Sequence, residues 1–174
     1  MNRFQELYNA DISRYPDGKV PGWNRRFHYF LRKIQTEQNR VLKAWYHLCF
    51  RIVSDRQRME ISHGAEIGKG LYLSDPFTVT INSNAVLGEN VTLGKNVTIG
   101  KQNRGKLAGT PVIGNGVQIG DNAVIVGAIR IGEDAVIAAN AYVNRDVPDG
   151  AHVSGNPAAP VPAPERELQG NSGA

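Results

Sequence analysis

The histidines are the side chains of this sequence best suited to acid–base chemistry near neutral pH, and there are four. His28 and His47 fall within the first 60 residues, and His63 and His152 fall in the remainder. A neutral imidazole, with an ordinary pKa near 6.5, can take up a proton close to pH 7. The two histidines of the second part are too few for a three-histidine metal site. The lone Cys49 excludes an intrachain disulfide and a cysteine-cluster zinc site.

The position of these residues depends on a six-residue repeat in the second part of the chain. Aliphatic residues recur every six positions, apart from one gap of eight and one of fourteen, and seven of the thirteen are followed directly by glycine. The repeated positions are Ile61, Ile67, Leu73, Ile81, Leu87, Leu93, Ile99, Ile113, Ile119, Ile125, Ile131, Ile137 and Val143. A fixed short period of this kind is typical of stacked structural repeats.

The repeat predicts short strands with inward-pointing aliphatic residues, separated by corners at which a small residue lets the backbone turn. A period of six suits neither an α-helix nor the alternating strands of a β-sandwich. Coils of a parallel β-helix fit it, and three hexads to a coil would stack residues 18 apart at roughly 4.8 Å. The gap of eight then predicts a two-residue bulge after Leu73. The gap of fourteen predicts an extruded loop at 101–112, of the kind that often carries function.

This register places several charged residues at equivalent positions. Asp75 lies two residues after Leu73, and Lys95 lies two after Leu93. We expect the two side chains to lie on successive coils, close enough to form an ion pair. His63 holds the same hexad position on another face of the prism, so it could reach Asp75 only from a neighbouring subunit.

The first 60 residues have a different organisation. They carry 12 basic and 6 acidic side chains, whereas residues 61–174 carry 8 and 10, and they hold only two of the 19 glycines. Apolar residues at helical spacing predict one helix around Trp23–Ile34 and another around Val41–Val53. The basic residues, among them Arg32, are expected on the outer faces. The helices could dock on the β-helix, stack subunits or contact an anionic membrane.

Length and composition fit one domain with an appendage. The chain has 174 residues, of which 41% are hydrophobic and 21% charged. No apolar run is long enough to cross a membrane, and the first residues lack the apolar core of a signal peptide, so we expect a cytoplasmic protein. We divide it into an α-helical segment (1–60), a β-helix (61–160) and a flexible tail (161–174).

Two features carry a family resemblance: the hexads of the form aliphatic, Gly, x, x, small, x, and the ending 143–158, in which Asp-Val-Pro precedes Gly-Asn-Pro-Ala. From residue 61 to about 160, the chain resembles the hexapeptide-repeat acyltransferases. Their fold is a left-handed parallel β-helix of triangular section. The helical segment before the repeats is similar to the serine O-acetyltransferase branch. The stretch 81–88 and the loop segment 103–106 look more like acetyltransferases of bacterial surface polysaccharides.

The resemblance implies an acetyl-CoA-dependent O-acetyltransferase that acts on a hydroxyl of serine or of a sugar. Such a reaction needs a base for the hydroxyl and a stabilised oxyanion. The sequence departs from the family here, because the histidine positions align with Asp75 and Thr110, and the corner that often carries a histidine in the polysaccharide group is Gly94-Lys95. The candidate catalytic residues are therefore Asp75, His63 and Lys95, while His152 lies toward the expected CoA end.

The family's CoA contacts carry over to two parts of the chain. They fall on stacked residues 18 apart and on the final coil, where Arg145 would face a CoA phosphate. The candidate CoA-binding residues are Asp121, Ala139, Asn144, Arg145, Gly155, Asn156 and Pro157.

The resemblance also bears on partners and on competing functions. It implies a homotrimer, or a dimer of trimers, with active sites between subunits, with no metal and no nucleic acid as partner. The missing histidines leave open a catalytically impaired homologue with a binding or scaffolding role. A γ-type carbonic anhydrase is excluded because it needs three histidine ligands. A sugar-nucleotide uridylyltransferase is excluded because 60 residues cannot hold its Rossmann-like domain.

Overall fold

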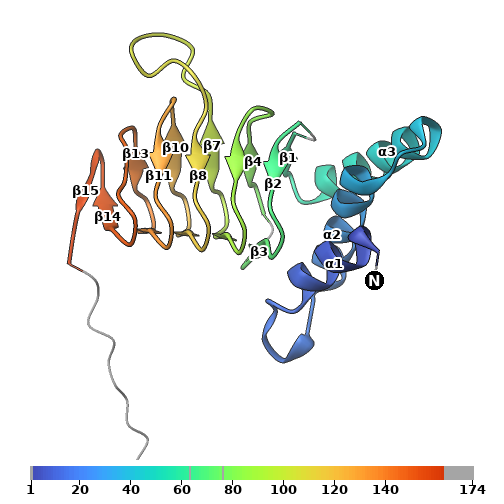
Figure 1. The fold of residues 1–174 in the computed structure, drawn as a ribbon. Coiled ribbons are helices and arrows are strands. Elements are labelled where there is room, and N and C mark those ends of the chain that lie inside the picture. Colours follow the sequence, from blue (N-terminus) through green and yellow to red (C-terminus); the bar gives the residue numbers. More distant parts are fainter. Residues whose placement is uncertain (1, 63, 76, 163–174) are drawn as a thin grey trace, which may run out of the picture.

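Three parallel sheets of very short strands form a left-handed β-helix in the computed structural model, which describes residues 2–62, 64–75 and 77–162. Figure 1 shows the coils stacked into a prism, with the helices at one end and a hairpin at the other. Sheet A contains β1 (Glu60–Ile61), β4 (Thr80–Ile81), β7 (Thr98–Gly100), β10 (Val124–Val126) and β13 (Tyr142–Val143). Sheet B contains β2 (Glu66–Ile67), β5 (Val86–Leu87), β8 (Val112–Ile113) and β11 (Arg130–Ile131). Sheet C contains β3 (Tyr72–Leu73), β6 (Thr92–Leu93), β9 (Gln118–Ile119), β12 (Val136–Ile137), β14 (His152–Gly155) and the antiparallel β15 (Ala158–Pro160).

The register confirms the predicted stacking. Ile81 pairs with Ile99, eighteen residues later, as the repeat requires. Leu73 instead pairs with Leu93, twenty residues later, because the bulge adds two residues at the corner after β3. The repeated aliphatic residues of β3 to β13 are at most 2% exposed and fill the interior of the prism. Burial of this column by successive coils stabilises the fold.

The extruded loop also lies where the repeat predicts it. It leaves the prism after β7 and returns at β8, and Figure 1 shows it standing clear of the coils. Two backbone hydrogen bonds of 2.9 Å between Gln102 and Gly109 close its base.

The glycines of the repeat avoid a clash, as predicted, but the left-handed turn itself falls elsewhere. Gly88, directly after Leu87, does not adopt a positive φ. A Cβ at Gly88 would lie 2.8 Å from the backbone nitrogen of Asn115 on the next coil, so the close approach of coils requires the glycine. The left-handed turn falls two residues later, at Asn90 with φ 59°. Asn, Asp or Gly occupies the equivalent position of other coils, since these residues tolerate that conformation best.

Three α-helices precede the prism: α1 (Arg3–Ile12), α2 (Gly22–Thr36) and α3 (Arg40–Arg56), with a short 3₁₀ turn at Pro16–Gly18. The last two match the predicted apolar periodicities, whereas α1 was not predicted. Asn2 and Gln5 form a capping box at the start of α1, and Asn39 caps α3 through the amides of Val41 and Leu42. Within the described residues, no helix is long and apolar enough to cross a membrane.

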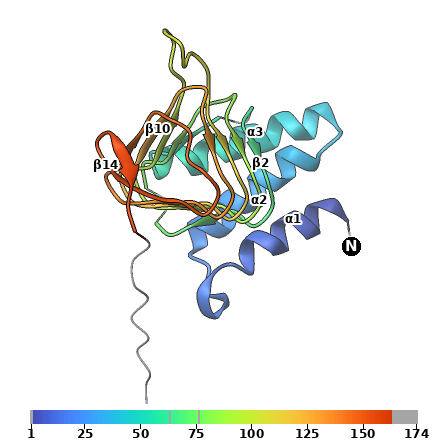
Figure 2. The same cartoon turned by 60° about the vertical axis from the view of Figure 1, so that its left-hand side comes forward.

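The helices cover the open first coil of the β-helix, and Figure 2 shows them across that end of the prism. Phe27, Leu31, Phe50 and Met59 belong to one continuous hydrophobic core with the coil interior. A terminal coil has no preceding coil to bury its apolar interior or to satisfy its backbone groups. The helical segment therefore docks on the β-helix, which is one of the roles that the sequence left open.

Candidate active site

Five of the candidate residues hold equivalent positions on successive coils. They lie along one edge of the prism, where the chain passes from sheet C to sheet A. We call this edge the C–A corner. In sheet C, the inward aliphatic residues of β3, β6, β9, β12 and β14 pair in register from one coil to the next. The residues two positions after them therefore form a column along this corner. The column contains Asp75, Lys95, Asp121, Ala139 and Gly155. Repetition of the hexad thus aligns residues that are far apart in the sequence.

A groove of about 340 Å³ runs along this corner. Gly94, Gly120, Ala138 and Ala139 keep its wall low, because none of them carries a side chain larger than a methyl group. The groove extends over the outer face of sheet C and reaches Ser74, beside Asp75. Its lining residues are Ser74, Thr92, Gly94, Gln118, Ile119, Gly120, Asp121, Val136, Ile137, Ala138 and Ala139. A shallow wall of small residues can accommodate an elongated ligand.

Lys95 pairs with Asp121, and the predicted ion pair between Lys95 and Asp75 is absent. The Lys95 ammonium lies 3.8 Å from Asp121 Oδ2, and the Lys95 backbone N–H donates to Asp121 Oδ1 over 3.1 Å. This amide contact fixes the carboxylate of the following coil beside Lys95, whereas Asp75 lies in the corner enlarged by two residues. Both partners of the pair are about half exposed, so their attraction is weak and leaves Lys95 available to an anionic ligand.

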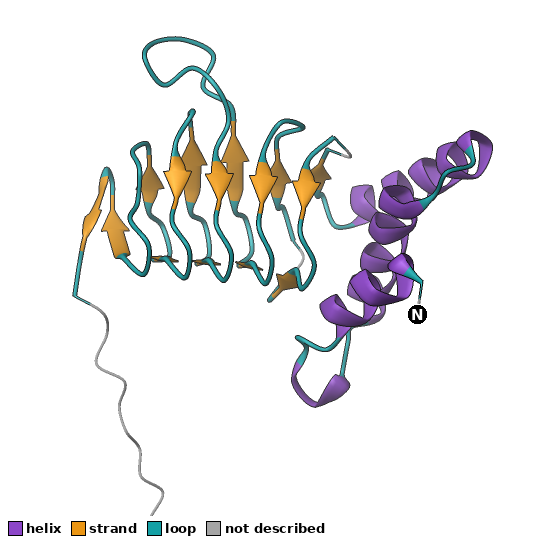
Figure 3. Ribbon diagram, viewed as in Figure 1, coloured by secondary structure: helices purple, strands orange, loops and turns teal. Residues whose placement is uncertain are grey.

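The other predicted CoA contacts lie outside the groove. Asn144 and Arg145 follow β13, where the chain leaves sheet A, and Arg145 is exposed on the same edge from which the extruded loop departs. Asn156 and Pro157 form the exposed turn between β14 and β15, at the end of the prism opposite the helices. Figure 3 shows this hairpin closing the stack. The structure therefore brings Asp121, Ala139 and Gly155 to one corner and places Arg145 on another.

Of the two histidines of the repeat region, the structure describes only His152. His63 lies outside the described residues. His152 begins β14 and pairs in register with Val136, which pairs with Gln118, so all three stand in one row on the outer face of sheet C. Because Val136 and Gln118 line the groove, His152 lies one strand beyond its far end. Thr110, which aligns with the family's loop histidine, donates its hydroxyl to the Asn84 carbonyl over 2.9 Å.

A second polar cluster, at the junction of helices and prism, was not found from the sequence. Asp11, His28 and Arg32 are fully buried there. Arg32 Nε and Nη2 donate to the Asp11 carboxylate over 2.7 and 2.8 Å, and His28 Nδ1 lies 3.1 Å from Asp11 Oδ2. The expectation that Arg32 lies on an outer face was wrong. The spacing of His28 and Arg32, four apart on one helix, was the available signal, but their partner Asp11 lies on a helix that the sequence did not predict.

This cluster satisfies backbone groups that the first coil leaves unpaired. Asp11 Oδ1 accepts the amides of Gly70 and Leu71 over 2.9 and 3.0 Å. Arg32 Nη1 and Nη2 donate to the carbonyls of Ile67 and Gly68 over 2.8 and 2.7 Å. In the interior of the prism the neighbouring coil makes such bonds. Buried backbone groups need partners, so the cluster acts as a polar cap on the β-helix.

Tyr15 completes the cap. Its hydroxyl lies 2.9 Å from His28 Nε2 and accepts a hydrogen bond from Asn24 Nδ2, also over 2.9 Å. Burial raises the pKa of Tyr15 to about 12, so the hydroxyl stays protonated and can donate to His28 Nε2. We assign the His28 proton to Nδ1, facing Asp11, because this tautomer gives both the Tyr15 O–H and the His28 N–H an acceptor.

The Asp11 carboxylate in the cap should make the stability of the fold depend on pH in the acid range. Burial by itself would raise the pKa of Asp11, but hydrogen bonds from His28 and Arg32 outweigh it and hold the pKa below the ordinary 3.8. The unfolded chain therefore takes up a proton at Asp11 at a higher pH than the folded chain does. The stabilisation is complete above about pH 5 and is lost as the pH falls through 3.8 toward the lower folded pKa. Urea unfolding at pH 6 and pH 3 should show a larger loss for the wild type than for Asp11→Asn; an equal loss would contradict this assignment.

Comparisons with known proteins agree with the repeat and the fold. The family model of the bacterial transferase hexapeptide (six repeats) matches residues 110–145. Serine acetyltransferase of Neisseria gonorrhoeae is 29% identical, with a TM-score of 0.72 over 92% of this chain and 68% of that one. Soybean serine acetyltransferase complexed with serine is 28% identical, with a TM-score of 0.73 over 91% and 69%.

A serine acetyltransferase in complex with CoA shares the fold at 23% identity, with a TM-score of 0.77 over 91% of this chain and 69% of that one. A comparison with curated proteins found no match. The hexad register, the triangular prism and these similarities together show that the chain has the hexapeptide repeat of bacterial transferases and the fold of the serine acetyltransferases.

Proposed function

We propose that this protein is an acetyl-CoA-dependent O-acetyltransferase that acetylates a hydroxyl of serine or of a sugar. The observation that carries the proposal is the groove at the C–A corner, with its wall of small residues. Asp75 and Lys95 directly follow two of its lining residues, Ser74 and Gly94. The structures most similar to this chain include a serine acetyltransferase with serine and another with CoA. The pantetheine arm of acetyl-CoA would lie along Ala139 and Asp121, with the thioester toward Asp75.

The reaction assigns a role to both Asp75 and Lys95. The acceptor hydroxyl attacks the thioester carbonyl, a C–O bond forms, and the C–S bond breaks to release the CoA thiolate. The Asp75 carboxylate takes the hydroxyl proton, and the Lys95 ammonium stabilises the oxyanion that develops on the carbonyl. In a homotrimer, His63 of a neighbouring copy would supply a second base. Arg145, on a different corner, would face the CoA phosphates bound by a neighbouring copy.

We predict that Ala139→Glu weakens acetyl-CoA binding at least about tenfold. The substitution places a carboxylate on the groove wall, where it occupies space and repels the polyanionic CoA. Titration calorimetry with acetyl-CoA measures the change. Val112→Glu is the matched control, because Val112 is also exposed but lies on sheet B, away from the groove. Equal affinity in the wild type and Ala139→Glu would place CoA elsewhere.

A catalytically impaired homologue is the second candidate, and two positions favour it. Asp75 stands where the family has a histidine, and the hydroxyl of Thr110 is already committed to a backbone carbonyl. Release of CoA thiol with serine and with a panel of sugars separates the two functions. Acetyl-CoA binding without turnover on any acceptor would support the impaired homologue; turnover would exclude it.

A further inference from the structure

The outward face of α3 is apolar. Val41, Trp45, Leu48 and Ile52 are 78%, 59%, 50% and 52% exposed. Their spacing of four, three and four residues places them in one line along the helix. The opposite face of α3 contributes the buried Phe50 and Val53 to the core. If α3 served only to cover this core, its outward face would be expected to be polar. Instead, both faces are apolar.

This face is also the main concentration of exposed apolar side chains in the described part of the chain. Of its nine large hydrophobic residues classed as exposed, five lie on α3, the fifth being Leu42. Isolated exposed apolar residues are ordinary, but a contiguous row on one element marks a surface that binds a partner. No described segment covers it, since α2 packs against the opposite face of α3, where Phe27 contacts Phe50, and α1 packs on α2. Figures 1 and 2 show the three helices side by side at this end of the prism.

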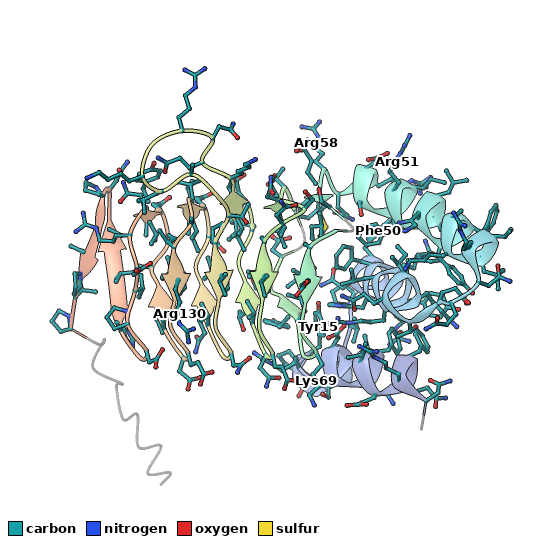
Figure 4. All side chains as sticks on the ribbon, turned by 45° about the horizontal axis from the view of Figure 1, so that its top comes forward. Tyr15, Phe50, Arg51, Arg58, Lys69 and Arg130 are labelled. Atoms are coloured by element: carbon teal, nitrogen blue, oxygen red, sulfur yellow. The ribbon has the colours of Figure 1, made fainter. Side chains whose placement is uncertain are left out.

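The charges on α3 indicate what the partner is. The helix carries Arg40, Lys43, Arg51 and Arg56 against a single acid, Asp55. Figure 4 shows Arg51 on the outer side of α3 and Phe50 at the junction with the prism. An apolar row that contains tryptophan and is bordered by cations matches a helix lying in the surface of an anionic bilayer. The long arginine and lysine stems can extend past the apolar row to the headgroups.

A second copy of the chain fits this surface less well. A twofold contact between two α3 helices would bury the apolar rows but would also bring two helices of net charge +3 together. Like charges across an interface oppose association, whereas anionic headgroups neutralise the cations that flank the apolar row. The charge balance therefore favours lipid.

We propose that α3 is a peripheral membrane-binding helix, which inserts Val41, Trp45, Leu48 and Ile52 at the acyl boundary of an anionic bilayer and binds the headgroups through the exposed Arg40 and Arg51 beside that row. The 17-residue helix would lie flat along about 25 Å of the surface. This binding does not depend on the reaction at the C–A corner, so either proposal can fail without the other.

Co-sedimentation with vesicles tests it on the full chain. We expect the protein to bind vesicles of phosphatidylglycerol and phosphatidylcholine in equal parts, and to bind pure phosphatidylcholine far more weakly. The pair Trp45→Glu and Leu48→Glu should lower the partition coefficient at least about tenfold. The double change Arg40→Gln and Arg51→Gln should lower it about twenty-five-fold, at about fivefold for each cation. Val112→Glu, an exposed apolar residue of the prism, should bind like the wild type.

Three outcomes would overturn the proposal. The wild type could fail to bind the anionic vesicles, or bind them equally well after both sets of substitutions. Alternatively, light scattering after gel filtration could show that Trp45→Glu with Leu48→Glu splits an oligomer while vesicle binding is absent, which would assign the face to a second copy. Circular dichroism melting of each variant verifies that the fold is intact, as is expected for exposed positions.

Discussion

Asp11→Asn is expected to lower the free energy of unfolding by about 3–5 kcal/mol, the typical cost of removing one partner of a buried ion pair. The asparagine keeps the volume of the side chain but leaves the guanidinium of Arg32 buried without a counter-charge. Its amide can also accept fewer hydrogen bonds than the carboxylate, which accepts from Arg32, His28, Gly70 and Leu71. For a chain of this length we expect the Tm to fall by about 10–15 °C.

Glu6→Gln is the matched control for this experiment. Glu6 also lies on α1 and forms an ion pair, with Lys69 over 3.7 Å, but both side chains are substantially exposed. Its replacement should change the unfolding free energy by less than about 1 kcal/mol. The double variant Asp11→Asn with Arg32→Met should recover part of the loss, because it removes the unpaired charge. A loss for Asp11→Asn no larger than that for Glu6→Gln would contradict the role of the cap.

Asp75→Asn is expected to lower kcat about a hundredfold and to leave the KM for acetyl-CoA nearly unchanged. The asparagine amide cannot take up the proton of the attacking hydroxyl, and a positioned base commonly contributes a factor of 100 or more to the rate. The substitution keeps the size of the side chain at the end of the groove. Initial rates of CoA thiol release, with an acceptor on which the wild type turns over, provide both constants.

Glu89→Gln is the control, since Glu89 holds the same position in its hexad at a different corner of the prism. It should leave kcat unchanged. The variant His63→Ala, measured beside it, separates the two candidate bases. If His63→Ala abolishes turnover and Asp75→Asn retains the wild-type rate, Asp75 is not the base.

The β-helix could be predicted closely because its repeat is local and frequent. Each inward position, such as Leu93 or Ile119, carries an aliphatic residue at the same spacing, and the pairing of coils follows from counting. The bulge after Leu73 and the extruded loop after Ile99 were predicted in the same way, as departures from six. The register also placed Asp121 and Ala139 in one column. The repeat predicts that the glycines avoid a clash, but not that the clash would be with the next coil, because a close approach between coils cannot be recognised in a single coil.

The polar contacts could not be predicted in this way. Lys95 was expected to pair with Asp75, yet its partner is Asp121, because the choice between two carboxylates at adjacent levels depends on corner geometry and on an amide contact. Arg145 was grouped with Asp121 from the resemblance, but they lie on different edges of the prism. The sequence repeat shows on which coil of the β-helix a residue lies. It does not show which neighbouring group its side chain contacts.

The sequence by itself determined the stacked β-helix, its coil register, its loop and the two amphipathic helices before it, because each depends on a period within a short stretch of chain. Only the tertiary structure decided that Asp11, His28 and Arg32 meet at the open coil, since their association depends on docking three segments against unpaired backbone groups of a fourth. It also decided that the second apolar face of α3 stays uncovered. Periodicity shows that a face is apolar, but only packing shows which faces find a partner within the chain.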